Sequence, residues 1–546
     1  MVNELMAAQQ IGFPILSALV LIPVLLAVLI GLTKSDVLAR KIALYGALAE
    51  LALSAYMLIR FIPGIADIQF AEKGQWLPTM GAGYHLGVDG ISVLFVPLTA
   101  FITAMVMLFS WNSVKFFNRF YLINLLLLEA ATIGIFVSLD LILFYLFYEL
   151  ALIPSYFLIK LWGVGPQRQY AGLKYVTYML IGSAPLLIGI VLLGLNYHDW
   201  ALTQGLAATY SFDYVALLAT PVDPSMQTAI FMLMAVGFAV KGPMLPFHTW
   251  MPSAIMEGPI GMGVFLVGLK VGAYGFIRFV IPLLPAASQE WFWLLAVVGL
   301  IAIVYGALIA LVQPNFRRLL AFASVSHVGL VMVGLFSLNA QSMQGALLMM
   351  VNMGITATGL LFIAGFLHHR TGSTELSAFG GIARRAPMLA VFCFVIGLAS
   401  IGMPGTSGFL GEFLTLLGAF QAHWAIAAVA VLGVILSAAY FLWYYERAFF
   451  GPVTGKLVDK LKDLNARELA IVVSITGLVF AIGLYPAPIL NVTSGSVAAL
   501  VDRLDNAAAA APRSASAATP ARSAQAGAPV APAVVSRAET VQATPR

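Results

Sequence analysis

The chain has 546 residues, of which 61% are hydrophobic and only 9% are charged, with a formal net charge of +5. Soluble domains carry roughly 25% charged residues, so this composition excludes a string of soluble domains and predicts an all-α protein that crosses a lipid bilayer several times. The one cysteine, Cys393, lies in an apolar run, and the seven histidines lack a metal-binding spacing. We expect no cofactor, metal or nucleic acid on this chain. Redox chemistry would need partner subunits.

A helix that spans the hydrocarbon core needs about 20 mostly apolar residues. Fourteen segments qualify, and one of them, 387–420, is too long for a single helix and is interrupted by Gly402, Pro404 and Gly405. The start of the chain lacks a basic region and a cleavage site, so we expect no signal peptide. The predicted spans are 13–32, 42–62, 90–110, 121–138, 141–162, 171–195, 227–247, 259–283, 291–312, 318–337, 344–367, 387–420, 425–449 and 468–488.

The loops between the spans carry charges of opposite sign on the two sides of the membrane. With the N-terminus outside, the cytoplasmic loops hold nearly all the basic residues, among them Lys34, Arg168 and Arg385, whereas the opposite loops hold acidic residues such as Asp67 and Asp213. Basic loops stay in the cytoplasm. The sequence therefore predicts that both ends of the chain face the periplasmic or equivalent side.

The spans also suggest an internal repeat. Two sets of five helices, 121–283 and 291–449, each have a broken fourth helix, and an odd number of spans inverts one copy relative to the other. Interrupted helices at matching places in two halves indicate a transport site. We expect N-terminal helices in 1–120, these two inverted repeats, a last span with its flanks in 450–505, and a disordered Ala/Pro/Ser tail in 506–546.

The first interruption lies in VGFAVKGPMLPFHTWMPSAIME, residues 236–257, where Lys241 precedes Gly242, Pro243 and Pro246. A lysine at the centre of a membrane helix costs roughly 2.5–3.5 kcal/mol on insertion scales, and the prolines leave backbone groups that need other partners. The alternative is a lysine that extends from a helix end to the interface. At least ten apolar or small residues precede Lys241, which favours a functional site.

Few ionisable residues are predicted to lie well inside a span. They are Glu129, Glu149, Lys174, Lys241, Lys270, His327 and Glu412. Burial favours the neutral form of a lysine, so such a lysine can accept and release a proton. Glu149 lies in FYLFYELALIPSYF and is predicted to pair with Lys241, either as a switch of its protonation or as a static ion pair.

The other predicted charges have open alternatives. His327 in ASVSHVGLVMVG is either a proton relay or a core histidine. Glu412 follows the second interruption in PGTSGFLGEF and is predicted to be a carboxylate at the exit or entry of the proton path. Glu129 in LLLLEAATIG either takes part in proton transfer or forms a local hydrogen bond.

Four motifs resemble those of a known family: LILFYLFYELALIPSYFLIKLWG, AVKGPMLPFHTWMP, LLAFASVSHVGLV and GMPGTSGFLGEFLTLLGAF. Over about 85–450 the chain resembles the antiporter-like membrane subunits of respiratory complex I, most closely the subunit M type. The resemblance implies that Glu149 and Lys241 are the essential pair, Lys270 the lysine of the central axis, His327 the bridging histidine and Glu412 the terminal carboxylate. Related antiporter subunits carry a lysine in place of Glu412.

The sequence departs from this family at three positions. Ser253 and Ile255 stand where Asp and His are common, and Met353 stands near an expected histidine. These changes leave fewer polar side chains along the proton path, so either water carries more of that path or this chain belongs to a divergent branch of the family.

By this resemblance the chain is a proton-translocating subunit, multi-pass in a bacterial inner membrane, beside sister antiporter-like subunits. NADH, FMN, iron–sulfur clusters and quinone are expected in the partner subunits. The alternatives are a cation/proton antiporter subunit without redox coupling and a purely structural spacer, and the cost of the intramembrane lysines argues against the spacer.

Overall fold

The computed structural model describes residues 3–114, 116–206, 209–453 and 456–510, with the side chains of Lys456 and Ala510 left out. The predicted tail from residue 511 onward lies outside the described residues. The last described helix, α25, spans Ala487–Ala510. It was not predicted, and it makes the first five residues assigned to the tail helical, because Asn506 is followed within the helix by four alanines, which have the highest helix propensity.

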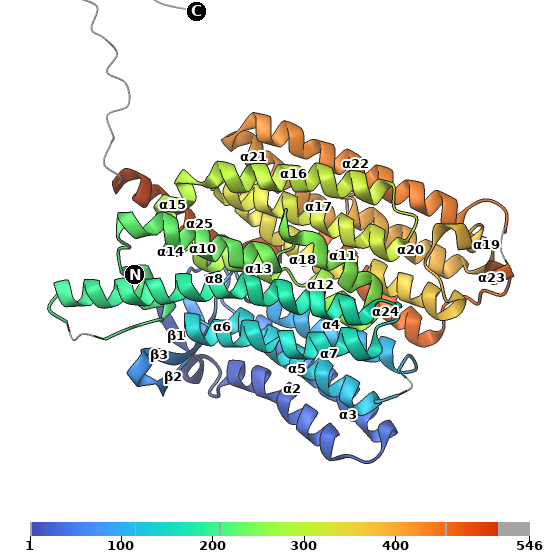
Figure 1. The fold of residues 1–546 in the computed structure, drawn as a ribbon, viewed down its shortest axis with the longest axis horizontal. Coiled ribbons are helices and arrows are strands. Elements are labelled where there is room, and N and C mark those ends of the chain that lie inside the picture. The colour runs from blue at the N-terminus through green and yellow to red at the C-terminus, as the bar shows by residue number, and fades with distance from the viewer. Residues whose placement is uncertain (1–2, 115, 207–208, 454–455, 511–546) are drawn as a thin grey trace, which may run out of the picture. The chain divides into compact units, whose positions relative to one another are not determined.

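In the described part of the chain, twelve helices or helix pairs are long and apolar enough to cross a membrane. They coincide with twelve of the fourteen predicted spans. The other two predicted spans contain the shorter apolar helices α4, Phe95–Ser110, and α20, Pro387–Ser400. Most helices run side by side along one direction (Figure 1), so the all-α multipass architecture is confirmed.

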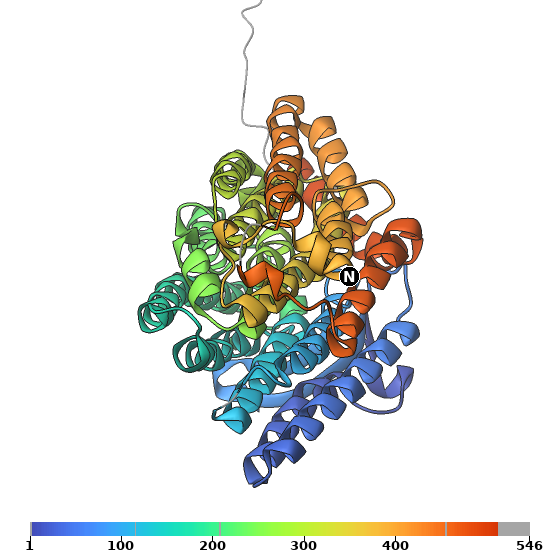
Figure 2. The same ribbon diagram turned by 90° about the vertical axis from the view of Figure 1, so that its right-hand side faces the viewer.

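The N-terminal part packs against one flank of the bundle. It contains α1 (Ala7–Gln10), α2 (Ile15–Leu32), α3 (Asp36–Arg60) and α4. Figure 2, which looks nearly along the helices, shows the blue N-terminal helices next to the helices that follow them. Helix α5 (Asn118–Val137) contacts α2, α3 and α4, and Glu129 in its middle is therefore enclosed on this side.

A small sheet covers the N-terminal end of the bundle. Strand β2 (Ile68–Leu77) pairs in parallel with β1 (Glu4–Met6) and antiparallel with β3 (Ala82–Val88). The sheet ends directly before α4, and Asp89, the first residue after β3, is buried.

Besides a turn at Ala151 within the predicted span 141–162, the first predicted repeat contains two helix interruptions beside lysine residues where one was expected. Its elements are α6 (Leu141–Leu150), α7 (Leu152–Trp162), α8 (Arg168–Thr203), α9 (Tyr214–Ala219), α10 (Pro224–Lys241), α11 (Trp250–Glu257), α12 (Ile260–Gly268), α13 (Val271–Gly275), a π-helical turn (Phe276–Val280) and α14 (Ile281–Leu283). The expected interruption follows Lys241. The unexpected one lies at Leu269 and Lys270.

The second predicted repeat has its interruption where the sequence placed it. The elements after α15 (Pro285–Glu290) are α16 (Phe292–Leu311), α17 (Phe316–Phe336), α18 (Ala340–Thr371), α19 (Ile382–Arg385), α20, α21 (Ser407–Ala422), α22 (Trp424–Phe449), α23 (Lys456–Asp459) and α24 (Ala466–Leu484). Helix α20 ends at Ser400 and α21 begins at Ser407, so the predicted break at Gly402 to Gly405 is present.

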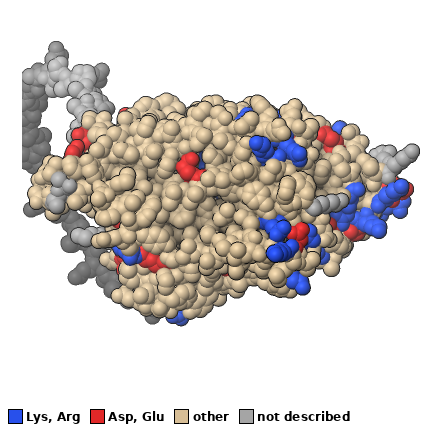
Figure 3. All heavy atoms as spheres, turned by 60° about the horizontal axis from the view of Figure 1, so that its bottom comes forward, with Lys and Arg blue, Asp and Glu red and all other residues tan. Residues whose placement is uncertain are grey.

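Charged side chains are sparse over the broad middle of the surface and gather toward its two ends (Figure 3). The blue, basic side chains concentrate at one end of this face, where Figure 1 places α19 and α23. An apolar belt between charged ends is the surface expected of a protein that sits in a bilayer.

Candidate functional site

Lys241 ends α10 and lies against α6. Its ammonium group donates a hydrogen bond to the backbone carbonyl oxygen of Tyr148 at 2.7 Å, and its nitrogen lies 3.4 Å from the centre of the Tyr148 ring. Helix α10 stops here because Gly242 and Pro243 follow, and proline cannot continue the backbone hydrogen-bond ladder. Tyr148 is buried, and its hydroxyl donates to the carbonyl oxygen of Gly237 at 3.1 Å, which ties α6 to α10.

The predicted pairing of Glu149 with Lys241 does not take the form of a direct ion pair in this structure. Among the described residues, none of the ion pairs within 4.0 Å joins these two side chains. Successive helical residues point about 100° apart, so when Tyr148 faces Lys241, Glu149 points toward the part-exposed side of α6. The charge of Glu149 still acts on Lys241. Tyr148 is the residue in direct contact with the Lys241 ammonium group, and the neighbouring Glu149 acts on Lys241 through its charge.

A small cavity of about 50 Å³ lies next to Lys241. Its wall includes Thr132 of α5, Ser155 of α7 and Tyr175 of α8, together with residues on both sides of the α12–α13 break. A cavity of this size has room for a few water molecules, and Lys241 and the three hydroxyl side chains supply polar groups in its wall. Water there can connect Lys241 to the break that carries Lys270.

Lys270 lies at the unexpected break, between the end of α12 and the start of α13. Its side chain is 3% exposed, and its ammonium donates a hydrogen bond to the Ser324 hydroxyl of α17 at 2.7 Å. His327, one turn further along α17, is close enough for the charge of Lys270 to act on it, and its Nε2 is buried without a hydrogen-bond partner in the described part of the chain. Lys270, Ser324 and His327 are therefore buried polar side chains near one another.

Glu412 lies on α21 beside the second break. Its side chain is buried, and the carboxyl group lies so close to Gly402 that a Cβ added there would be 2.0 Å from Oε2. Gly402 has φ +72°, which glycine adopts without strain. The Tyr440 hydroxyl of α22 is buried and unpartnered within the described residues, and the Glu412 charge reaches it. This carboxyl group thus faces a glycine and a phenol at the break.

Among the described residues, the two remaining predicted ones, Lys174 and Glu129, form no hydrogen bond or ion pair with the groups around Lys241, Lys270 and Glu412. Lys174 is near the start of α8, about 9 Å along the helix from Arg168, and it donates to the Ser253 hydroxyl of α11 at 3.3 Å. Glu129 is fully buried in α5, on the side toward α3 and α4. The predicted roles of Lys241, Lys270 and His327 in proton transfer stay predictions. Sequence reasoning set Lys174 too deep, because α8 begins earlier and runs longer than the predicted span.

The sequence analysis missed two buried charged pairs. Arg278, in the π-helical turn, forms an ion pair of 2.5 Å with Asp89, and both side chains are buried. Glu50 of α3 is fully buried near Glu129. Arg278 lies within the predicted span 259–283, and Asp89 lies in the loop directly before the predicted span 90–110. The signal for Glu50 was its place in the alanine-rich stripe of a predicted span, ALYGALAELAL.

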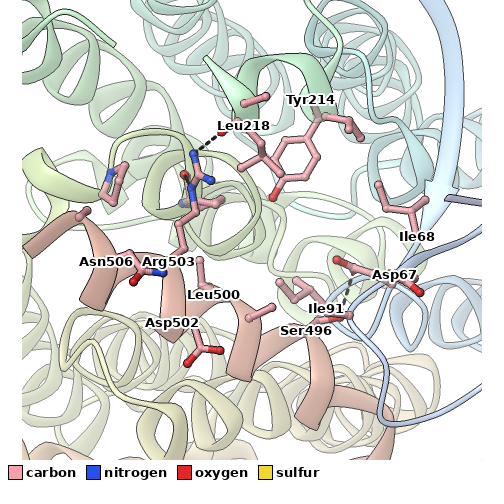
Figure 4. A pocket seen from close by; sticks show the side chains of 18 residues that line it. Asp67, Ile68, Ile91, Tyr214, Leu218, Ser496, Leu500, Asp502, Arg503 and Asn506 are labelled. Carbon is pink, nitrogen blue, oxygen red and sulfur yellow. Dashed lines mark hydrogen bonds between the residues drawn. The ribbon is translucent and has the colours of Figure 1, made fainter. Parts of the chain in front are cut away.

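A cavity of about 820 Å³ opens at the end of the bundle that holds the sheet. Figure 4 shows its wall: Tyr214 of α9 and Arg503 of α25 reach into it from opposite sides. Arg503 donates to the carbonyl oxygens of Leu218 and Pro282, each at 2.6 Å. Asp89, the partner of Arg278, also lines this cavity, so the buried ion pair lies next to an open space.

These features define a class of protein: an all-α multipass membrane protein with buried ionisable groups at interrupted helices, the arrangement found in ion transporters. The family model described as NADH:quinone oxidoreductase/Mrp antiporter, transmembrane, matches residues 138–437, more than half of the chain. The chain belongs to this family, and the predicted resemblance is confirmed.

Two relatives and one solved structure are similar over most of the chain. NADH-quinone oxidoreductase subunit M of Rickettsia typhi is 36% identical over 498 residues, which cover 89% of this chain and 99% of the relative. Subunit M of Rhodobacter capsulatus is 38% identical over 470 residues, which cover 85% and 90%. A chain in the structure of respiratory complex I from Thermus thermophilus with bound NADH has a TM-score of 0.80 and 32% identity, and the match covers 90% of this chain and 99% of that chain.

Proposed function

We propose that this chain is a proton-translocating membrane subunit of an NADH-quinone oxidoreductase of the complex I type. The observation that carries the proposal is the group formed by Lys241, a water-sized cavity and the Lys270–Ser324–His327 cluster at mid-bundle. The chain works as one subunit of a proton-translocating enzyme complex. Sister antiporter-like membrane subunits are its partners, and the electron-transfer cofactors NADH, FMN, iron–sulfur clusters and quinone belong to other subunits.

Proton transfer is proposed to run between these groups in the plane of the membrane. Lys241 holds a proton against the Tyr148 ring and carbonyl, and the charge of Glu149 favours that protonated form. When that charge is withdrawn, Lys241 can release its proton to the cavity water and so toward Lys270. His327 accepts from Lys270 and relays the proton onward, since an imidazole changes its protonation with small changes in surroundings.

Glu412 is proposed to end the path, and Lys174 to supply it from the basic end. The short carboxylate-to-glycine contact at Gly402 leaves Glu412 at the second break, where free backbone groups and water can meet it. Moving one charge against about 100 mV costs about 2.3 kcal/mol. A change in one buried electrostatic contact is of that magnitude.

The two five-helix sets, 121–283 and 291–449, are proposed to be inverted repeats, and the charge distribution supports an N-terminus on the periplasmic side of a bacterial inner membrane. Lys174 at the start of α8 is near the basic end, whereas Asp89 and the 820 Å³ cavity are at the opposite end.

The proposal is tested by Glu149→Gln and Lys241→Met in the intact complex, reconstituted in vesicles. We expect normal assembly and nearly complete loss of NADH-driven proton uptake in both variants. Glu446→Gln, at an exposed position of α22, is the matched control and should pump normally. Proton movement that continues without NADH, or that survives inhibition of the quinone site, would support an independent antiporter and overturn the proposal.

A further inference from the structure

Helix α3 turns one narrow stripe toward the bundle and the rest of its surface outward. The buried residues of this stripe are Ala39, Ala43, Ala47, Glu50, Ser54 and Met57. Glu50 is 0% exposed in the middle of the stripe, whereas Tyr45 and Ile59 on the outer face are more than half exposed. The carboxyl group of Glu50 therefore points into the protein, and it does not extend to a membrane interface.

Glu129 of α5 is its neighbour across the helix interface. It is also 0% exposed, and the charges of the two carboxyl groups repel each other. In the described part of the chain neither group forms an ion pair within 4.0 Å, and all four carboxyl oxygens are buried without a hydrogen-bond partner. Two acidic groups thus share an apolar interface without a counter-ion.

The third group at this interface is the Thr103 hydroxyl of α4, which faces Glu129. Its hydrogen already goes to the carbonyl oxygen of Thr99, at 3.0 Å. Because a hydroxyl has one hydrogen, Thr103 offers Glu129 only an acceptor. A hydrogen bond between these side chains requires that the carboxyl group supply the proton.

An ionised carboxylate in an apolar interior is costly unless it is paired and hydrogen-bonded, and two adjacent ones cannot both ionise. We propose that Glu50 and Glu129 form a proton-binding site in which the two carboxyl groups share at least one proton. Binding and release make and break only carboxyl O–H bonds. Within the shared state, Glu129 can donate to Glu50 or to Thr103.

This site lies beside the face of α5 that lines the Lys241 cavity. Thr132, one turn from Glu129 on the same helix, lines that cavity, and so does Leu128. Because successive helical residues point about 100° apart, Glu129 is turned to the side of that face, toward α3 and α4. On the basis of the proposed function, the pair is a proton store that exchanges with the proposed proton path from the side of the N-terminal helices.

The existence of the site is tested by infrared spectroscopy of the intact complex at neutral pH, in H₂O and D₂O. We expect absorption from a protonated carboxyl carbonyl that is reduced in both Glu50→Gln and Glu129→Gln and is unchanged in Glu446→Gln. Thr103→Val should shift the band, because it removes the acceptor. If a glutamine variant does not assemble, aspartate at the same position keeps a carboxyl group and should keep a displaced band. Spectra that are the same in all these variants overturn the site.

The role of the pair is tested separately by NADH-driven pumping. We expect each glutamine variant to lower the number of protons moved per NADH, and the double variant Glu50→Gln/Glu129→Gln to be no worse than the more affected single variant, because either change removes the pair of carboxyl groups that shares the proton. Full pumping in the double variant overturns the storage role. Loss of pumping in Glu149→Gln tests the main path and does not depend on this result.

Discussion

The ammonium of Lys241 lies over the face of the Tyr148 ring and bonds to the carbonyl oxygen of the same residue. A single tyrosine therefore holds the lysine by two different interactions, one from its side chain and one from its backbone. Glu149, the next residue, acts on the same lysine through its charge alone. Any movement of α6 changes all three interactions together, which makes this helix the natural element for setting the protonation of Lys241.

The ring of Tyr148 is expected to matter more than its hydroxyl. A cation–π contact is worth about 0.5–2 kcal/mol, so Tyr148→Leu should slow proton pumping about two- to thirtyfold by weakening the hold on charged Lys241. Tyr148→Phe keeps the ring and loses only the bond to Gly237, and should pump at close to the normal rate. Equal losses in the two variants, measured as initial rates in vesicles, would contradict a role for the ring.

Ser324 is expected to position the proton on Lys270. Ser324→Ala removes the acceptor at 2.7 Å, and hydrogen bonds to charged groups contribute about 1.5–3 kcal/mol. Pumping should fall at least tenfold while NADH oxidation in detergent is retained. Ser324→Thr keeps a hydroxyl and should recover much of the activity. The optimum pH of pumping should move in the alanine variant, which loss of packing alone would not cause.

Gly402→Ala is expected to displace Glu412. The new methyl group would lie 2.0 Å from a Glu412 oxygen, and alanine at φ +72° adds roughly 1–2 kcal/mol of backbone strain. Gly372→Ala is the matched control, because Gly372 has φ +71° and nothing within 4 Å of the added carbon. Both variants carry the backbone strain. Loss of pumping in Gly402→Ala alone would therefore show that the contact with the Glu412 carboxyl group is the cause. Identical behaviour of the two variants would exclude it.

The buried Asp89–Arg278 pair is expected to stabilise the π-helical turn that follows α13, beside the 820 Å³ cavity. Asp89→Asn leaves the Arg278 charge buried without a counter-ion, which costs about 3–5 kcal/mol. The purified complex should lose this subunit at a lower temperature. The control is Asp459→Asn, because Asp459 forms an ion pair with Arg385 in which both side chains are at least half exposed. Exposed ion pairs contribute only about 0–1 kcal/mol. Equal melting of the two variants would show that the buried pair is not structural.

The sequence predicted the spans and both breaks that contain proline, because hydropathy and proline act locally. It did not predict the break at Lys270, where the flanking residues are Val, Gly and Leu, and the interruption depends on packing against α17. Lys241 was identified, but its contact was not, because a sequence cannot show which of two successive residues, Tyr148 or Glu149, turns inward. Glu50 was missed because one glutamate in an alanine-rich helix resembles an exposed residue until the neighbouring helices are in place.

Glu50 also bears on how the chain is made. Helix α3 leaves the ribosome long before α5, so Glu50 enters the bilayer before Glu129 or Thr103 is present. An acidic side chain at a helix centre raises the cost of insertion by a few kcal/mol, and α3 must offset this with its outward apolar face. The packing of α3 is therefore completed late in folding. It is inserted early as a weakly hydrophobic span and gains its polar neighbours only when the fourth predicted span arrives.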